Sequence, residues 1–141
     1  MRKARGVSSV TLLVWVGILA AAYLLLAFGR VYWDNFEVQG ILRQAANECY
    51  RQTNDSEVRL SIVNKLHATF DVTGEDRVGR NVVRMPLLFD EGDIQIQRTE
   101  VPKYVNIWFT YQRQVTLPLI GQERVLTFND HAEQDLSPVK W

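Results

Sequence analysis

The sequence predicts an α+β protein whose first helix spans a membrane, and three patterns carry this expectation. Residues 7–28 form an unbroken apolar run, residues 31–68 repeat their apolar positions every three or four residues, and much of residues 82–133 alternates apolar with polar side chains. The expected order is a transmembrane helix continuing into a long amphipathic helix, a second helix, and an antiparallel meander of three to four strands. Both helices should pack on one face of the sheet.

The apolar run reads VSSVTLLVWVGILAAAYLLLAF from Val7 to Phe28 and contains neither a charge nor a proline. Its 22 residues would extend about 33 Å as an α-helix, which matches a hydrocarbon core about 30 Å thick. We therefore expect a transmembrane helix over residues 7–29. A cleavable secretory signal is the alternative, but its apolar region is usually about 7–15 residues long and ends in small residues. Here the alanines, Ala20 to Ala22, lie in mid-span.

The flanks of the run predict its orientation. Residues 1–6 form a basic flank that contains Arg2, Lys3 and Arg5. The positive-inside rule places this flank in the cytoplasm. Beyond the run, an interface belt is expected at the opposite membrane surface, formed by Arg30, Tyr32 and Trp33. Residues 30–141 would then be one extracytoplasmic α+β domain, and the expected location is a bacterial inner membrane with this domain in the periplasm.

The helical pattern continues past the membrane until the polar cluster Gln52–Asp55 interrupts it. Asn54, with Glu57 three residues later, resembles a capping box that opens a second helix, and this helix should end near Ala68. The polar stretch Thr73–Asn81 is expected to be a loop. The stripe of the long helix that should face the sheet holds Val38, Leu42, Ala45 and Cys49.

Strands are expected in the last third of the chain. The first, Val82–Phe89, should lie at a sheet edge because Pro86 has no amide proton for a ladder. A turn at Asp90–Asp93 precedes a strand that begins at Ile94, and the connection Leu117–Gln122 precedes a last strand that begins at Glu123. The strand between them alternates most regularly, with one apolar face formed by Val105, Ile107, Phe109 and Tyr111.

Composition argues against several classes of function. All four basic residues near the apolar run lie within the first 30 positions, so the rest of the chain carries 12 basic against 16 acidic residues. Such a domain offers no basic face for nucleic acid. The single cysteine, Cys49, excludes an intramolecular disulfide. Neither His67 nor His131 belongs to a recognisable ligand motif. We expect no metal, cofactor or small-molecule substrate, no catalytic residues, and therefore no enzyme.

Several segments together resemble one known family. Residues 5–13 read RGVSSVTLL, residues 93–98 read DIQIQR, and residues 111–121 read YQRQVTLPLIG, followed by Leu126-Thr127-Phe128 and by Glu133. These segments resemble the family catalogued as domain of unknown function 4845. The resemblance implies a membrane helix, a short helix and a few strands that close in a hairpin, and it brings no catalytic residues. Residues 71–92 depart from the family pattern, and we interpret them as a lineage-specific interaction feature.

The N-terminus also resembles type IV pilins and pseudopilins, whose processing site is a glycine followed by an apolar residue. Gly6 and Val7 fit that pattern. The glutamate that the family carries five residues into the mature helix would fall on Thr11, so it is missing here. The resemblance therefore argues against a major filament subunit and leaves open a minor pilin-like or pseudopilin subunit.

Two surfaces are candidates for partner binding. Gly17 and Ala21 give one side of the membrane helix a small-xxx-small spacing that allows close helix packing, and we group Trp15 and Tyr23 with this anchor surface. Trp108 should lie on the more polar face of its strand, either as a partner anchor or covered by a helix or loop. The expected function is a membrane-anchored accessory or scaffold protein that docks on a membrane or envelope protein complex.

Overall fold

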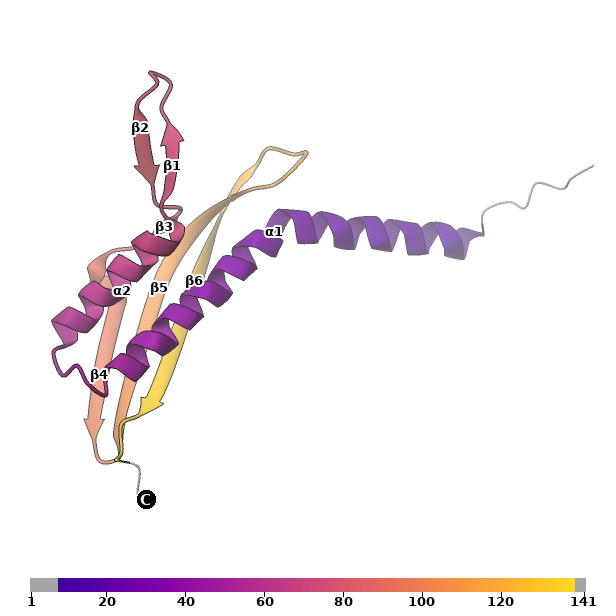
Figure 1. The fold of residues 1–141 in the computed structure, drawn as a ribbon. Coiled ribbons are helices and arrows are strands. Elements are labelled where there is room, and N and C mark those ends of the chain that lie inside the picture. The colour runs from indigo at the N-terminus through magenta and orange to yellow at the C-terminus, as the bar shows by residue number, and fades with distance from the viewer. Residues whose placement is uncertain (1–7, 139–141) are drawn as a thin grey trace, which may run out of the picture.

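The computed structural model describes residues 8–138 and has the expected α+β architecture (Figure 1). Two helices come first, α1 (Ser9–Glu48) and α2 (Asp55–Phe70). A small hairpin follows, formed by β1 (Val72–Glu75) and β2 (Asn81–Arg84). The remaining elements are β3 (Leu87–Leu88), the 3-10 helix η1 (Glu91–Asp93), β4 (Ile94–Glu100), β5 (Lys103–Thr116) and β6 (Glu123–Asp135).

Helix α1 joins the apolar run to the domain without a break. Its 40 residues extend about 60 Å at the usual rise. The N-terminal part is exposed along its length, and the first buried side chains are Ala27 and Val31. Figure 1 shows α1 bent where the apolar part meets the part that lies on the sheet. The prediction of one helix that runs out of the membrane segment into an amphipathic continuation is confirmed.

The main sheet is organised around β5. Strand β6 pairs along one edge of β5, from Tyr104 opposite Asp135 to Thr116 opposite Glu123. The other edge is shared by β4 and β3, both antiparallel to β5, with η1 between them. The short β3 follows Pro86, which lacks a ladder donor, so pairing resumes only at Leu87.

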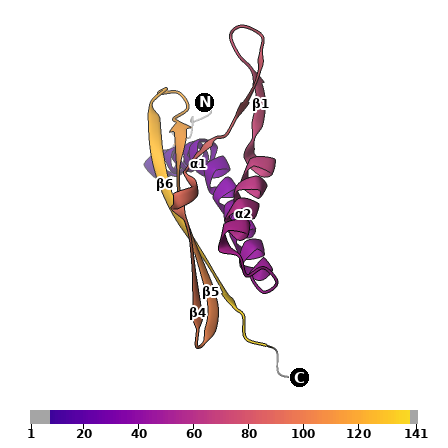
Figure 2. The same cartoon turned by 90° about the vertical axis from the view of Figure 1, so that its left-hand side faces the viewer.

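Both helices cover the same face of this sheet (Figure 2). Alternation along β5 buries every second side chain, and Val105, Ile107 and Phe109 have no exposed surface. The helices contribute the matching stripes at the spacing of one or two helical turns. They bring to the core Val38, Ile41, Leu42, Ala45, Ala46 and Cys49 from α1, and Val58, Ile62, Leu66 and Phe70 from α2, with Cys49 lying just after the last residue of α1.

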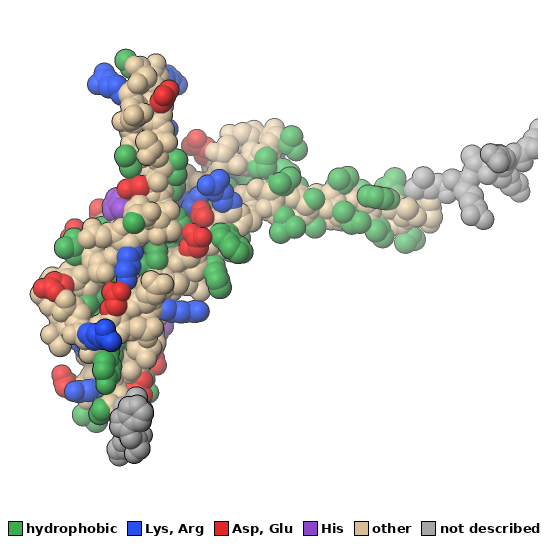
Figure 3. Space-filling model, in the orientation of Figure 1, with side chains coloured by type: hydrophobic (Ala, Val, Ile, Leu, Met, Phe, Trp, Pro, Cys, Tyr) green, Lys and Arg blue, Asp and Glu red, His purple; other side chains and the backbone are tan. Residues whose placement is uncertain are grey.

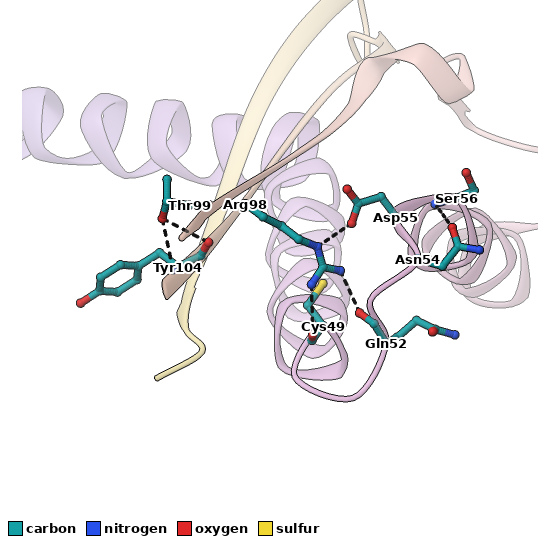
Figure 4. Close-up of polar contacts among 8 residues, drawn as sticks. All are labelled: Cys49, Gln52, Asn54, Asp55, Ser56, Arg98, Thr99 and Tyr104. Carbon is teal, nitrogen blue, oxygen red and sulfur yellow. Dashed lines mark hydrogen bonds and ion pairs between the residues drawn. The ribbon is translucent and has the colours of Figure 1, made fainter. Parts of the chain in front are cut away.

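Arg98 fixes the turn between the helices to the end of β4 (Figure 4). Its guanidinium donates to the carbonyl oxygens of Cys49 at 3.2 Å and Gln52 at 2.8 Å, and to the Asp55 carboxylate at 2.6 Å. Carbonyl groups at the C-terminal end of a helix and just beyond it have no intrahelical partner. The planar guanidinium of Arg98 satisfies two of them after α1, and it also pairs with Asp55, the first residue of α2. Asn54 is the N-cap of α2, and its side chain accepts from the amide of Ser56 at 3.1 Å.

Two predictions for this region need correction. The stretch Thr73–Asn81 is a loop only over residues 76–80; its ends belong to the paired strands β1 and β2, and the turn between them has Gly79 at φ 76°. The expected single strand Val82–Phe89 is divided at Pro86 between this hairpin and the main sheet. The hairpin projects away from the body of the domain (Figures 1 and 2), so neither of its faces shows the apolar alternation that a half-buried strand requires.

Candidate functional site

An exposed apolar surface lies where the apolar part of α1 meets the domain. An open groove of about 860 Å³ runs along α1 beside the start of β6. We call this groove the membrane-proximal surface; it is lined by Leu24, Leu25, Phe28, Gly29, Tyr32, Trp33, Phe36 and Leu126. Figure 3 shows hydrophobic side chains along the whole apolar arm of α1, while charged side chains gather on the domain. This helix is long and apolar enough to span a membrane.

The interface belt predicted from the sequence lies within or next to this surface. Tyr32 is 63% exposed and Trp33 67%, and Arg30 is also exposed. Trp33 donates from Nε1 to the Glu37 carboxylate at 3.3 Å, and the Tyr32 ring meets Phe128 edge-on at 6.0 Å. Amphipathic aromatic side chains with one polar end suit a membrane–water boundary, where the ring is apolar and the polar end stays wet.

The β5–β6 loop, residues 117–122, also reaches the apolar part of α1. The Tyr23 hydroxyl donates to the carbonyl oxygen of Pro118 at 2.8 Å, and Tyr23 is only partly exposed. Tyr23, assigned from the sequence to the anchor surface, thus contacts the chain's own hairpin. The two residues lie 95 positions apart, so no local sequence pattern could predict this contact.

A buried polar network lies beneath this end of the domain. Arg113 on the inner face of β5 forms an ion pair with Asp34 of α1, and their side chains are 11% and 14% exposed. Asp130, buried on β6, accepts from the side-chain amides of Asn35 and Gln39 at 3.3 Å each. Because every member on α1 meets a partner on the sheet, the network fixes the rotation of α1 about its own axis.

Burial sets the ionisation of the network. The pKa of Asp130 is raised because burial penalises the carboxylate, and the hydrogen bond from Gln39 offsets this only in part. Burial also raises the pKa of Tyr111, with the charge of Asp130 adding to the effect, so the phenol stays neutral. Asp130 holds α1 on the sheet through its hydrogen bonds from Asn35 and Gln39, whereas the buried Tyr111 hydroxyl has no hydrogen-bond partner within the described residues.

Asp130 should make the free energy of unfolding rise as the pH falls, which is the opposite of the usual effect of a carboxyl group. Its folded-state pKa lies above the ordinary value of 3.8, so the folded protein binds the proton at higher pH than the unfolded chain does. Its contribution to the free energy of unfolding therefore rises as pH falls through the folded pKa, and it is complete below 3.8. The test compares the free energy of unfolding of the wild type with that of Asp130→Asn, both measured by urea titration. We expect the wild type minus variant difference to increase as the pH is lowered from neutral to pH 4.

Asp135 provides a control of opposite sign. Hydrogen bonds from Ser137 lower the pKa of this exposed carboxyl, one of them from the Ser137 amide at 2.7 Å. Its stabilising contribution is present above the ordinary pKa and is lost as pH falls through the folded pKa. The free energy of unfolding of the wild type minus that of Asp135→Asn should therefore decrease as the pH is lowered. If both differences changed in the same direction, the burial assigned to Asp130 would be contradicted.

Trp108 lies on the face of the sheet that the helices leave open. It is 37% exposed, and its ring stacks on His131 of β6 at 5.0 Å, while His131 meets the Asn106 side chain at 2.8 Å. Among residues 8–138, neither helix packs on this face (Figure 2). The expected position on the polar face is confirmed, and the partial cover comes from a neighbouring strand.

The two histidines lie on separate elements. His67 is in the last turn of α2 and pairs with Asp71 at 3.0 Å, whereas His131 stacks on Trp108. Within the described part of the chain, no three His, Cys, Asp or Glu side chains come together as a metal site. Cys49 is buried, and burial raises the pKa of its thiol.

The remaining predicted anchor residues are exposed along α1. Gly17, Ala21 and Trp15 make no contact with the domain, and a Cβ placed on Gly17 would meet nothing within 4 Å. They are therefore free to meet lipid or another helix. The processing site proposed at Gly6 and Val7 lies outside the described residues.

Three comparisons with known proteins were made. No family model, no curated protein and no solved structure matches this chain.

Proposed function

We propose that this chain is a single-pass protein of a bacterial inner membrane whose periplasmic domain is a non-enzymatic accessory or scaffold subunit of a membrane or envelope protein complex. The observation that carries the proposal is the continuity of α1. The apolar part of this helix is exposed, and the rest of the same helix supplies five residues to the core cluster. A domain built on its own anchor holds a defined orientation at the membrane surface, which a scaffold requires.

The polar interior supports the non-enzymatic part of the proposal. Arg113 pairs with Asp34, Asp130 accepts from Asn35 and Gln39, and Arg98 serves the turn between the helices. Each group is engaged in fixing one element on another. By contrast, the exposed apolar and aromatic side chains lie on the anchor, on the membrane-proximal surface and on the open sheet face, where proteins or lipid can reach them.

The anchor offers the sharpest test of partner binding. Gly17 and Ala21 lie one turn apart on the same side of α1, where close approach of a second helix is sterically open. We expect Gly17→Leu and Ala21→Leu to insert normally, because leucine favours the bilayer, and to lose co-purifying membrane proteins after crosslinking in native membranes.

Ala22→Leu is the matched control. Its side chain points about 100° away from that of Ala21 around the helix, yet the substitution adds the same volume. It should retain the partners that the first two variants lose. If all three variants retained them, the binding surface would lie outside the membrane, and Trp108 and the β1–β2 hairpin would be tested next.

A minor pilin-like or pseudopilin subunit is the second candidate. It is favoured by the same long helix, whose apolar half extends free of the domain while its other half packs on an antiparallel sheet. Intact mass of the protein purified from its native membrane separates the two candidates. Loss of residues 1–6, with or without methylation of Val7, supports the pilin reading, and an intact N-terminus supports the anchored scaffold.

A further inference from the structure

The β5–β6 loop lies beside the segment of α1 that is expected to span the membrane. Its Pro118 carbonyl accepts from Tyr23 at 2.8 Å. Tyr23 precedes Gly29, the outer end of the expected span, by six residues, or about 9 Å along the helix. If α1 crosses a bilayer, this loop is therefore level with the membrane interior nearest the domain and not with the surrounding water.

The tip of the loop exposes apolar side chains that have no use within the chain. Leu119 is 96% exposed and Ile120 63%, and the loop from Leu117 to Gln122 carries no charge. Leu119 also adopts φ 71°, a backbone conformation that costs a residue with a side chain about 1 kcal/mol or more. Glycine would suit that backbone better, and a polar residue would suit water better. A lipid environment accounts for leucine at this position.

The backbone of the loop is also prepared for a poorly hydrated site. The Leu117 amide donates to the Gln122 carbonyl at 2.8 Å, and the Gly121 amide donates to the Leu117 carbonyl at 2.9 Å. Pro118 has no amide proton, and its carbonyl is satisfied by Tyr23. An unsatisfied backbone group is costly in hydrocarbon, so these hydrogen bonds lower the cost of placing the base of the loop, at Leu117, Pro118 and Gly121, against lipid.

We propose that the tip of the β5–β6 hairpin inserts into the leaflet nearest the domain, with Leu119 and Ile120 in contact with lipid acyl chains. The membrane-proximal surface includes Leu126 of β6, the strand that leaves this loop, and its apolar groove would be filled by the same lipids. The proposal rests on α1 spanning the membrane, as the proposed function does. A second membrane contact limits the tilt of the domain, so the open sheet face and the β1–β2 hairpin keep a fixed inclination relative to the membrane.

Fluorescence quenching in the full chain tests the proposal. Three single variants, Leu119→Cys, Val78→Cys and Ile18→Cys, are labelled with nitrobenzoxadiazole and reconstituted into phosphatidylcholine–phosphatidylglycerol vesicles. Val78 lies in the turn of the β1–β2 hairpin and is 70% exposed, so it is an accessible reference position, and in the free chain it is less exposed than Leu119. Ile18 lies within the expected span. Cys49 can stay in place because it is buried and its raised thiol pKa disfavours the thiolate.

The expected result is strong quenching of the label at position 119 by doxyl-labelled lipids. Quenching by aqueous iodide at position 119 should be at least about threefold weaker than at position 78, because the anion does not enter hydrocarbon. The comparison between the two positions cancels any mixed orientation of the protein in the vesicles. Equal iodide quenching at positions 119 and 78 overturns the proposal, because the loop would then lie in water. This outcome would hold both for a loop with no partner and for a loop that binds another protein.

The label at position 18 separates this inference from the anchor on which it rests. If lipid quenchers reach position 18 and not position 119, the anchor stands and the inserted hairpin is wrong. If they reach neither position, the anchor itself is wrong.

Discussion

A chain that begins at Gln52 is expected to lose the cooperative fold that a chain beginning at Arg30 retains. The shorter chain lacks the α1 side chains that cover the sheet, among them Val38, Leu42 and Ala45, each without exposed surface. Their removal would uncover several hundred Å² of apolar surface, worth on the order of 10 kcal/mol at about 25 cal/mol per Å². That is comparable to the total stability of a typical small domain, about 5–15 kcal/mol.

Thermal and urea unfolding of the two soluble chains measure this difference. The chain from Arg30 keeps Asp34, Asn35 and Gln39 and with them the buried network, so it should unfold in one sharp transition. The chain from Gln52 should show no transition. In a second experiment, a peptide of residues 30–51 is added to the shorter chain. The peptide should restore the unfolding transition if the shorter chain fails to fold because it lacks the packing of α1. Equal midpoints for the two chains would contradict the assignment of α1 to the core.

Those parts of the fold that repeat a local pattern could be predicted from the sequence. The 22-residue apolar run and the alternation over Val105–Tyr111 each follow a single period, and the structure places a helix and a strand there. Asn54 was expected to open the second helix, and it is the N-cap of α2. These elements depend on short-range chemistry, so no knowledge of the tertiary contacts was needed.

The β1–β2 hairpin could not be predicted in this way. Its strands have four residues each and expose Val72 and Val83, so no buried face marks them in the sequence. The only local signal was Gly79, whose positive φ closes the turn. The departure of residues 71–92 from the family pattern did point to this segment, although as an interaction feature and not as paired strands.

The contacts at the membrane-proximal end were beyond local patterns for a different reason. Asn35 meets Asp130 and Tyr23 meets Pro118 across 95 positions of sequence. Nothing in the sequence around Asp34, or around Arg113 in the family-like segment at residues 111–121, marks the two as partners. Only the fold shows that they form a buried pair, and hence that the domain is fixed to its anchor.

Phe109→Ala is expected to destabilise the domain by about 3–5 kcal/mol, the usual cost of emptying a buried phenylalanine site. Phe109 has no exposed surface and stands in a row of aromatic rings. It stacks on Tyr111 at 5.1 Å and receives Phe89 edge-on at 5.1 Å, so its loss would leave a cavity bordered by two rings and the helices. Phe109→Leu keeps most of the volume and should cost less than Phe109→Ala.

Gln112→Ala is the matched control on the same strand, and it should cost under about 1 kcal/mol. Gln112 is exposed on the open face of β5, three residues from Phe109 and therefore on the opposite side of the pleat. The urea midpoints of the three variants are measured in the chain from Arg30. Phe109→Ala should have the lowest midpoint, Phe109→Leu should be intermediate, and Gln112→Ala should be close to the wild type. Because a shift of one residue in the register of β5 would exchange the two faces, a lower midpoint for Gln112→Ala than for Phe109→Ala would mean that the helices cover the other side of the sheet, and equal midpoints would contradict the burial of Phe109.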